Sequence, residues 1–600
     1  MLSESIEKDL NSFADTIGVF VDKALSEEGQ KQALGKVTHI LDVASQLIDH
    51  IDSENDRDKQ QPDSNINGKS VLETLQLLFQ AALTKPDVLA KHYCEFATSV
   101  LDVLSQQSEL EPEPADRRFK DDLWHESIFL NSLMKIYLAW DQQINSWISE
   151  QSFSSADERR VQFIFNQIIY AFSPSNLPVN PSALKRAEKT EGRSAVKGLL
   201  NWVKDSCFNQ SMPRQIRDDA FKVGKNLATT PGQVVFRNKL LELIQYQPQT
   251  PYVHRRPVLL VPPQINKYYI FDLKQKNSVL GYLLKQNLQM FVISWRNPGK
   301  SESHWGLDEY VVALLEAIEV MRVITKSRTV GLISACAGCL TTSALLGYLA
   351  ETKNPVIKNH TSLVTALTPD NDSILELFTT QQTLKLARAH TQIEGILDGK
   401  ALARVFAWLR PEDLVWNYWV NNYLMGRDPP TLDVLYWDND STNLPAKLHG
   451  DFLDMFEQDV FQNAHLHKVL GIPIDYRKVC VDTYVIAGRE DYLMPWKGVY
   501  KTTRIFRGKH RFVLSTSGHV QSVLRPPSLA HTEYYTNETL CESADEWLES
   551  STRQDGTWWV DWTSWLKKQS GALKKSPQKL GAKNFPPLCN APGRYVCDEK

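Results

Sequence analysis

The sequence has few of the features that assign a chain to a special class. Its 600 residues contain no run of about 18 apolar residues, so no membrane-spanning helix is expected. A formal net charge of -4 argues against a general binder of nucleic acid or membrane surfaces. The eight cysteines are irregularly spaced and make no disulfide framework, and the first residues lack the basic and apolar regions of a signal peptide. These absences predict a cytoplasmic protein, and its length of 600 residues allows two to four domains.

Helical and strand-like patterns divide the chain into consecutive parts. Residues 1–115 are expected to form a helical extension that includes a polar break at 52–69 and ends in a proline-containing linker. Residues 116–245 continue as a helical, aromatic-rich N-terminal domain. Residues 246–570 change to an alternation of short apolar runs and helical patterns, and residues 571–600 read as a polar C-terminal tail. The chemistry is therefore sought within 246–570.

Six short apolar runs in the third part are expected to be buried strands: 258–261, 290–295, 330–333, 363–367, 483–487 and 511–515. Helical patterns such as 312–324 separate most of them, and this alternation predicts an α/β fold with a mostly parallel sheet. The gap from about 370 to 480 carries a helical, aromatic-rich pattern of the size of a cap over an active site. Within it, Asp438 and Asp440 are expected to lie in loops or turns.

The segment around Cys336 is the most informative part of the chain. The apolar run 330–333 meets a turn of small residues with Cys336 at its apex, and a strongly helical run follows. This is the layout of a nucleophile elbow, in which a strained turn joins a strand to a helix. The helix N-terminus favours a thiolate and, later in a reaction, an oxyanion. The usual pattern is Gly-x-nucleophile-x-Gly, and Ser334 stands here at the first glycine position.

An acid and a histidine occur where the α/β-hydrolase fold requires them, each in a loop after a later strand. Asp491 follows the run 483–487, and His519 follows the run 511–515. Both loops lie at carboxyl ends of predicted strands, where open α/β sheets place ligands. We therefore predict a catalytic triad in which His519 takes the thiol proton of Cys336 and Asp491 orients His519.

The predicted oxyanion hole needs two backbone N–H donors. In this fold one belongs to the residue after the nucleophile, here Ala337. The second comes from the loop after an early strand, here 261–270, where Ile265 is chosen as the candidate donor.

The elbow also allows two other interpretations. The Cys336-x-x-Cys339 spacing occurs in thioredoxin-like redox motifs, but such a domain is much smaller and would not be embedded in the middle of this sheet. Cys339 is expected instead to face the core from the helix. Ser334 lies before the apex of the turn, so it is expected to be only a small residue in place of glycine.

Other acids and histidines compete with the triad. His510 and Asp482 precede their strands, which places them at the wrong end of the sheet, while Glu490 stays a weak rival of its neighbour in the sequence. His465 and His467 have the spacing of a metal-binding pair, but no third ligand is nearby, so they are expected on the surface and no metal site is predicted.

Many blocks of this sequence resemble the polyhydroxyalkanoate synthases. They lie at residues 116–119, 228–232, 243–246, 261–269, 294–298, 416–423, 437–445, 488–496 and 517–519. Details at 406–411, 449–451 and 518–522 are most like the class II, single-subunit synthases, which favour medium-chain monomers. The lipase-box-like motif of the family is Gly-x-Cys-x-Gly-Gly, from which this chain departs at Ser334 and Cys339. Both replacements are small, so activity is expected to survive.

The resemblance implies a reaction and its partners. (R)-3-hydroxyacyl-CoA would acylate Cys336 and release CoA, and the 3-hydroxyl of another acyl unit would attack the thioester and extend a polyester. Asp491 would help to activate that hydroxyl, and Gln521 would line the acyl pocket. The resemblance further implies no cofactor besides the CoA of the substrate, a homodimer, and association with polyester granules.

Two rival functions stay open. An acyl-CoA thioesterase or polyester depolymerase would use the same triad but would yield free acid and no polymer. A non-catalytic granule-binding or scaffold protein would bind without releasing CoA. The presence of all three triad residues disfavours the scaffold, and the length of the resemblance disfavours the hydrolase.

Overall fold

The computed structural model describes residues 77–597 except 79–80, 83, 210–211, 218, 370–372 and 375–380. The chain forms two compact units, residues 1–199 and residues 200–600. The predictions for residues 1–76, including the polar break, lie outside the described residues. Within the described part of the chain, no helix is both long and apolar enough to cross a membrane.

The described part of the first unit is helical. Its helices are α4 (Pro86–Leu104), α5 (Leu123–Glu126), α6 (Ile128–Ser149), α7 (Ser155–Ala171) and α8 (Pro181–Lys189), and α9 (Arg193–Phe208) spans the division between the units. Side-chain oxygens cap three of these helices: Ser127 accepts from Leu130 N, Ser154 from Asp157 N, and Asn180 from Ala183 N. The caps explain why these helices begin at these residues.

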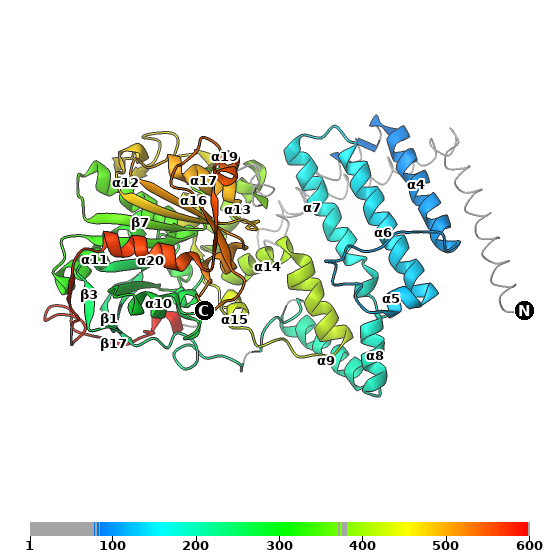
Figure 1. Cartoon of the computed structure of the whole chain (residues 1–600), viewed down its shortest axis with the longest axis horizontal. Helices are drawn as coiled ribbons and strands as arrows, with labels where there is room; N and C mark the ends of the chain where they lie inside the picture. The colour runs from blue at the N-terminus through cyan, green and yellow to red at the C-terminus, as the bar shows by residue number, and fades with distance from the viewer. Residues whose placement is uncertain are drawn as a thin grey trace, which may run out of the picture. The chain divides into compact units, whose positions relative to one another are not determined.

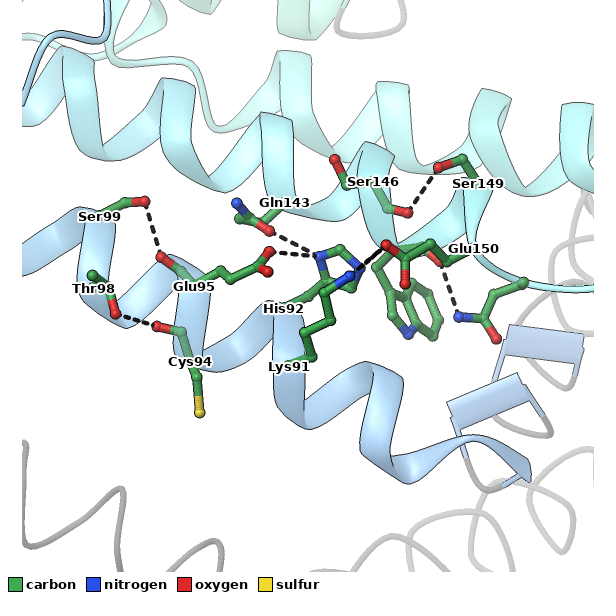
Figure 2. Close-up of polar contacts among 12 residues, drawn as sticks. Lys91, His92, Cys94, Glu95, Thr98, Ser99, Gln143, Ser146, Ser149 and Glu150 are labelled. Atoms are coloured by element: carbon green, nitrogen blue, oxygen red, sulfur yellow. Dashed lines mark hydrogen bonds and ion pairs between the residues drawn. The ribbon is translucent and has the colours of Figure 1, made fainter.

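Helix α4 packs on α6 around a buried histidine, His92 (Figure 2). The His92 ring lies 2.8 Å from Gln143 Oε1 through Nδ1, and 3.3 Å from Glu150 Oε1 through Nε2. Glu150 also binds Lys91 at 2.7 Å. The sequence places α4 in an extension separate from the domain that begins at residue 116, whereas the structure packs α4 and α6 within one unit.

The second unit is built on a large sheet with helices around it (Figure 1). The sheet has eleven strands in the order β15-β14-β13-β12-β7-β6-β4-β5-β2-β1-β17. The strands are β1 (Gly232–Arg237), β2 (Leu241–Tyr246), β4 (Val258–Val261), β5 (Met290–Trp295), β6 (Val330–Ala335), β7 (Ile357–Leu363), β12 (Asp482–Gly488), β13 (His510–Ser515), β14 (Glu533–Thr536), β15 (Thr552–Asp555) and β17 (Cys589–Asn590). The strands from β5 to β13 pair in parallel, and the outer strands pair antiparallel. This confirms the predicted α/β-hydrolase fold with a mostly parallel sheet.

Helices cover both faces of this sheet. Their bounds are α10 (Val279–Lys285), α11 (Leu307–Thr325), α12 (Ala337–Glu351), α17 (Trp496–Lys501), α18 (His519–Val523), α19 (Ala544–Glu549) and α20 (Trp558–Gln569). Leu259 packs with α11 and α12, whereas the next residue, Leu260, packs with α10 and α20. Because both faces of the sheet are buried, its central strands consist of consecutive apolar residues, and such strands are easily identified in the sequence.

The helical cap predicted near 370–480 is confirmed between β7 and β12. It contains α13 (Gln381–Glu394), α14 (Gly399–Leu409), π-helical turns at Glu412–Trp416 and Trp419–Leu424, α15 (Asp433–Asn439) and α16 (Ala446–Glu457). Three short strand pairs lie outside the large sheet: β8 (Ile396–Leu397) with β9 (Leu444–Pro445), β10 (Lys468–Val469) with β11 (Ile472–Pro473), and β16 (Leu573–Lys575) with β3 (Tyr252–His254).

One predicted strand and one predicted helical segment are wrong. The strand expected at 363–367 lies earlier, at β7, because its buried residues are mostly polar and the apolar signal begins only where the strand ends. The helical domain expected to reach residue 245 gives way to strands β1 and β2 from Gly232 onward. Strand β2 carries Glu242, which is fully buried yet accepts a hydrogen bond from Arg237 Nε at 2.7 Å, and this buried polar pair disguised the strand.

The polar tail expected at 571–600 is also wrong for the described residues. Strand β16 pairs with β3, and β17 pairs with β1 at the edge of the large sheet. Glu242 anchors the same segment, because its Oε2 accepts from the backbone N–H groups of Arg594 at 2.8 Å and Tyr595 at 3.0 Å. A polar composition identified the segment as surface but carried no signal for these long-range pairings.

Candidate active site

Cys336 occupies the sharp turn between β6 and α12. It is the N-cap residue of α12 and has φ 47° and ψ -130°, a strained conformation for a residue with a side chain. Its N–H donates to Leu363 O at 3.2 Å, and its carbonyl accepts from Cys339 N at 2.8 Å. A Cβ at Gly338 would lie 2.7 Å from Pro262 O, so only glycine lets α12 approach the end of β4 this closely. The turn has the geometry expected of a nucleophile elbow.

His519 and Asp491 meet at the carboxyl ends of β12 and β13. The His519 Nδ1–H donates to Asp491 Oδ2 at 2.7 Å. The other carboxylate oxygen, Oδ1, accepts from Leu493 N at 3.0 Å and Met494 N at 2.9 Å. A Cβ at Gly488 would lie 2.4 Å from Ser517 O, so glycine there allows the two loops to come together.

The Cys336 thiol interacts electrostatically with the same imidazole. Because Asp491 occupies Nδ1, the other ring nitrogen, Nε2, is the one available to the thiol. Burial disfavours the charged ring, but the Asp491 carboxylate and the Cys336 sulfur outweigh it and raise the pKa of His519 to about 10. The structure therefore pairs His519 with Asp491 and lets the Cys336 sulfur influence the same ring, while the assignment of the three residues as a catalytic triad stays a prediction.

The two predicted oxyanion donors lie on neighbouring segments. Ala337 is the first residue of α12, where a backbone N–H has no acceptor within the helix. The loop that carries Ile265 rests against the same helix, because Gln264 Nε2 donates to Thr341 Oγ1 at 2.8 Å. The Ile265 carbonyl accepts from Thr442 N of the cap at 3.0 Å. The assignment of Ile265 as a donor stays a prediction.

The cap is anchored to this loop by a carboxylate that the sequence indicated only as a turn residue. Asp440 forms an ion pair with Lys267 at 2.8 Å and accepts from the Tyr269 hydroxyl at 3.0 Å. Burial and the nearby carboxylate hold the pKa of Tyr269 far above its usual value, so the phenol stays a donor. Trp437 Nε1 adds a bond to Lys267 O at 2.7 Å. The residues on both sides of this contact lie in sequence blocks that resemble the family, at 261–269 and 437–445. That resemblance was the only feature of the sequence that could have indicated their importance.

The rival residues lie elsewhere. His510 and Asp482 begin β13 and β12, at the end of the sheet opposite His519. Glu490 is exposed, whereas the carboxylate of Asp491 is completely buried.

The predictions for the remaining residues have mixed outcomes. His467, expected on the surface, is half-buried and bonds through Nδ1 to Tyr476 OH at 2.7 Å. No group of three metal-binding side chains occurs among the described residues. Gln521 is exposed two residues after His519, and its place in an acyl pocket stays a prediction.

Ser334 does more than occupy a small space. It is fully buried at the end of β6, and its hydroxyl lies 2.7 Å from His360 Nε2 and 3.1 Å from Cys339 Sγ. Cys339 faces the core, as expected. His360 belongs to β7, and the sequence analysis missed it because its partner is 26 residues away along the chain.

Comparisons with known proteins agree on one family. A family model described as the N-terminus of poly-beta-hydroxybutyrate polymerase matches residues 115–283, and one for the alpha/beta hydrolase fold matches residues 257–526. Poly(3-hydroxyalkanoate) polymerase 1 of Ectopseudomonas oleovorans is 42% identical over 535 residues, covering 89% of this chain and 96% of that protein. Polymerase 2 of the same organism is 43% identical over 532 residues, covering 88% and 95%.

More distant proteins also match. The poly(3-hydroxyalkanoate) polymerase subunit PhaC of Cupriavidus necator is 36% identical over 490 residues, covering 80% of this chain and 83% of that protein. Among solved structures, the monoacylglycerol lipase of Paleococcus ferrophilus is 16% identical with a TM-score of 0.31, covering 55% of this chain and 99% of that one.

Proposed function

Because the chain belongs to the poly(3-hydroxyalkanoate) polymerase family, we propose that it polymerises (R)-3-hydroxyacyl-CoA through a thioester on Cys336. The observation that carries this proposal is an imidazole that bonds to a buried carboxylate and interacts electrostatically with a cysteine of strained backbone. Acyl transfer to a thiol needs those three parts: a nucleophile, a base and a group that orients the base.

The first half-reaction acylates the enzyme. His519 takes the thiol proton, and the Cys336 sulfur attacks the thioester carbonyl of the acyl-CoA. The N–H of Ala337 and a second donor from the loop around Ile265 stabilise the oxyanion of the tetrahedral intermediate. When the intermediate collapses, the CoA sulfur leaves and recovers a proton from His519. A thiol suits this step because thiolate is both a good nucleophile and a good leaving group.

The second half-reaction lengthens the polyester. The 3-hydroxyl of another acyl unit attacks the thioester on Cys336, and its proton passes to His519, which Asp491 holds in position. The C–S bond then breaks, the ester forms, and the Cys336 sulfur leaves and recovers a proton from His519. Water would compete with this hydroxyl and release free acid. The cap tied to the Lys267–Tyr269 loop by Asp440 supports exclusion of water from the reacting thioester. Action as a homodimer at the surface of polyester granules forms part of the proposal and rests on the family alone.

The test is CoA release from (R)-3-hydroxyacyl-CoA by purified protein, with the molecular mass of the product recorded. We expect release and high-mass polymer from the wild type, and neither from Cys336→Ala. Cys480→Ala is the matched control, because Cys480 is an exposed free cysteine of the same unit. Release of monomeric acid alone would make the protein a thioesterase, and activity in Cys336→Ala would overturn the assignment of the nucleophile.

A further inference from the structure

A buried polar network lies directly beneath the elbow. Ser334 Oγ is its centre, 2.7 Å from His360 Nε2, 3.1 Å from Cys339 Sγ and 2.9 Å from Thr342 Oγ1. Ser362, the partner of Ser334 in the pairing of β6 with β7, lies 3.5 Å from the same sulfur. Ser334, Cys339 and His360 are each no more than 1% exposed. Polar atoms this deeply buried are costly unless they bond to one another.

The directions of these hydrogen bonds follow from the donors and acceptors available. Burial, helped by His510, lowers the pKa of His360 to about 3, so the ring is neutral and carries one proton. Its Nδ1 has no partner among the described residues. If Nε2 carries the proton, it donates to Ser334 Oγ, and the serine hydroxyl is left to donate to Cys339 Sγ. Ser334 thus satisfies both neighbours at once.

The network links one departure from the Gly-x-Cys-x-Gly-Gly motif, Ser334, to His360 on the neighbouring strand and to the other departure, Cys339. A glycine at position 334 would leave both nitrogens of the buried His360 ring without partners. It would also remove the 3.1 Å contact to Cys339 Sγ. Buried polar groups left unpaired are destabilising, so Ser334 and His360 are expected to be useful only together.

We propose that Ser334, Cys339 and His360 form one positioning unit that fixes the backbone of the nucleophile. The three side chains belong to β6, α12 and β7, which are the three segments that meet at Cys336. Strand β7 also supplies the Leu363 carbonyl that accepts from Cys336 N, and Cys339 N donates to the Cys336 carbonyl. Linking these segments holds the strained φ of Cys336 and the direction of the Ala337 N–H. None of the three groups touches substrate, and the inference rests on the proposed role of Cys336.

The test compares two replacements of His360 that differ in hydrogen bonding. His360→Gln keeps an N–H donor for Ser334, whereas His360→Leu keeps an apolar side chain without one. We expect His360→Leu to lower kcat for CoA release about tenfold, with KM changed less than about twofold, and His360→Gln to retain most of the wild-type kcat. The rate at which iodoacetamide alkylates Cys336, followed by mass spectrometry, should fall with kcat. Equal kcat values in both variants would overturn the proposal.

A double-mutant cycle tests the coupling directly. Ser334→Gly alone should also lower kcat about tenfold, and the double variant with His360→Leu should be no slower than either single variant. Independent losses that multiply to about a hundredfold would overturn the idea of one unit. If the His360→Leu variant does not fold, the kcat of Ser334→Gly is compared with the kcat values of the wild type and of His360→Gln, and this comparison still tests the proposal.

Two controls separate positioning from general damage and from failure of the proposed function. Ser343→Ala removes a fully buried hydroxyl on the same helix that has no hydrogen-bond partner among the described residues, and it should leave kcat unchanged. A loss of melting temperature with unchanged kcat in Ser334→Gly would make the network merely structural. Cys336→Ala addresses the proposed function by itself, because its inactivity is required whatever the network does.

Discussion

His519 donates to Asp491 Oδ2 at 2.7 Å, while the Oδ1 atom of that completely buried carboxylate is held by the backbone N–H groups of Leu493 and Met494. The carboxylate therefore has a fixed orientation. Oδ1 accepts hydrogen bonds from the loop backbone, and Oδ2 accepts one from the imidazole. These hydrogen bonds also determine how the side-chain amide of an asparagine at position 491 would be oriented.

Asp491→Asn should lower kcat roughly a thousandfold without unfolding the protein. The asparagine oxygen must take the place of Oδ1 to accept from the loop, which turns the NH2 group toward His519. The ring then has to carry its proton on Nε2, where it cannot accept one from Cys336. The measurement is kcat for CoA release, together with the melting temperature. Asp482→Asn, at the opposite end of β12, is the control and should be unaffected; comparable losses in both variants would contradict the explanation.

His519 should make the folded protein less stable as the pH rises from about 6.5 to about 10. Its pKa is raised in the folded state, so its contribution to stability is complete below the unfolded pKa and is lost as pH passes through the folded value of about 10. Melting temperatures of wild type and His519→Gln, measured from pH 6 to 10, should converge toward the alkaline end. A constant difference across that range would contradict the raised pKa.

Asp438 should also make the folded protein less stable as the pH rises, but over a lower pH range. Burial raises the pKa of this carboxyl, on cap helix α15, to about 6, and it has no ion-pair partner among the described residues. Stability is therefore lost as pH rises from about 3.8 to 6, and the carboxylate costs about 2–3 kcal/mol above that range. Asp438→Asn should raise the melting temperature at pH 7.5 and leave it unchanged at pH 3.5. An equal gain at both pH values would point to packing instead of charge.

Asp440→Ala should loosen the cap. The change leaves the Lys267 ammonium, whose side chain is only 10% exposed, without its carboxylate and removes the acceptor of the Tyr269 hydroxyl. We expect a loss of about 1–3 kcal/mol in the free energy of unfolding. Because water gains access to the thioester, the share of free acid among the products should rise.

Product analysis by mass, per CoA released, measures the effect on water exclusion. Arg410→Ala is a suitable control, because its ion pair with Asp413 is also in the cap but about half exposed and should contribute little. An unchanged ratio of acid to polymer in Asp440→Ala would remove the proposed role of this anchor.

The sequence was most informative where the physical cause is local. Strands β6, β12 and β13 are buried on both faces, so their apolar runs are easily recognised in the sequence, and the order of Cys336, Asp491 and His519 along the chain is the basis of the predicted triad. The position of strand β7 was not predicted correctly, because the strand carries buried polar residues that pair with groups on other elements.

The remaining features arise from partners that are distant in sequence. Ser334 with His360, and Asp440 with Lys267, each combine two ordinary residues that acquire a role only when the fold brings them together. Glu242 with the backbone of Arg594 spans 352 residues, and no periodicity or spacing in the sequence encodes that pairing. Tertiary contacts of this kind explain why the sequence-based prediction of a free C-terminal tail failed.

The pairing of β1 with β17 has a consequence for how the protein is made. Strand β1 ends at Arg237, but the segment that covers its outer edge, Cys589–Asn590, leaves the ribosome some 350 residues later. Until then the nascent chain carries an open strand edge, the kind of surface that pairs with other chains. During synthesis there is therefore a long interval in which most of the sheet is present but the outer edge of β1 has no partner strand. Pairing of β17 with that edge is a late, long-range step of folding.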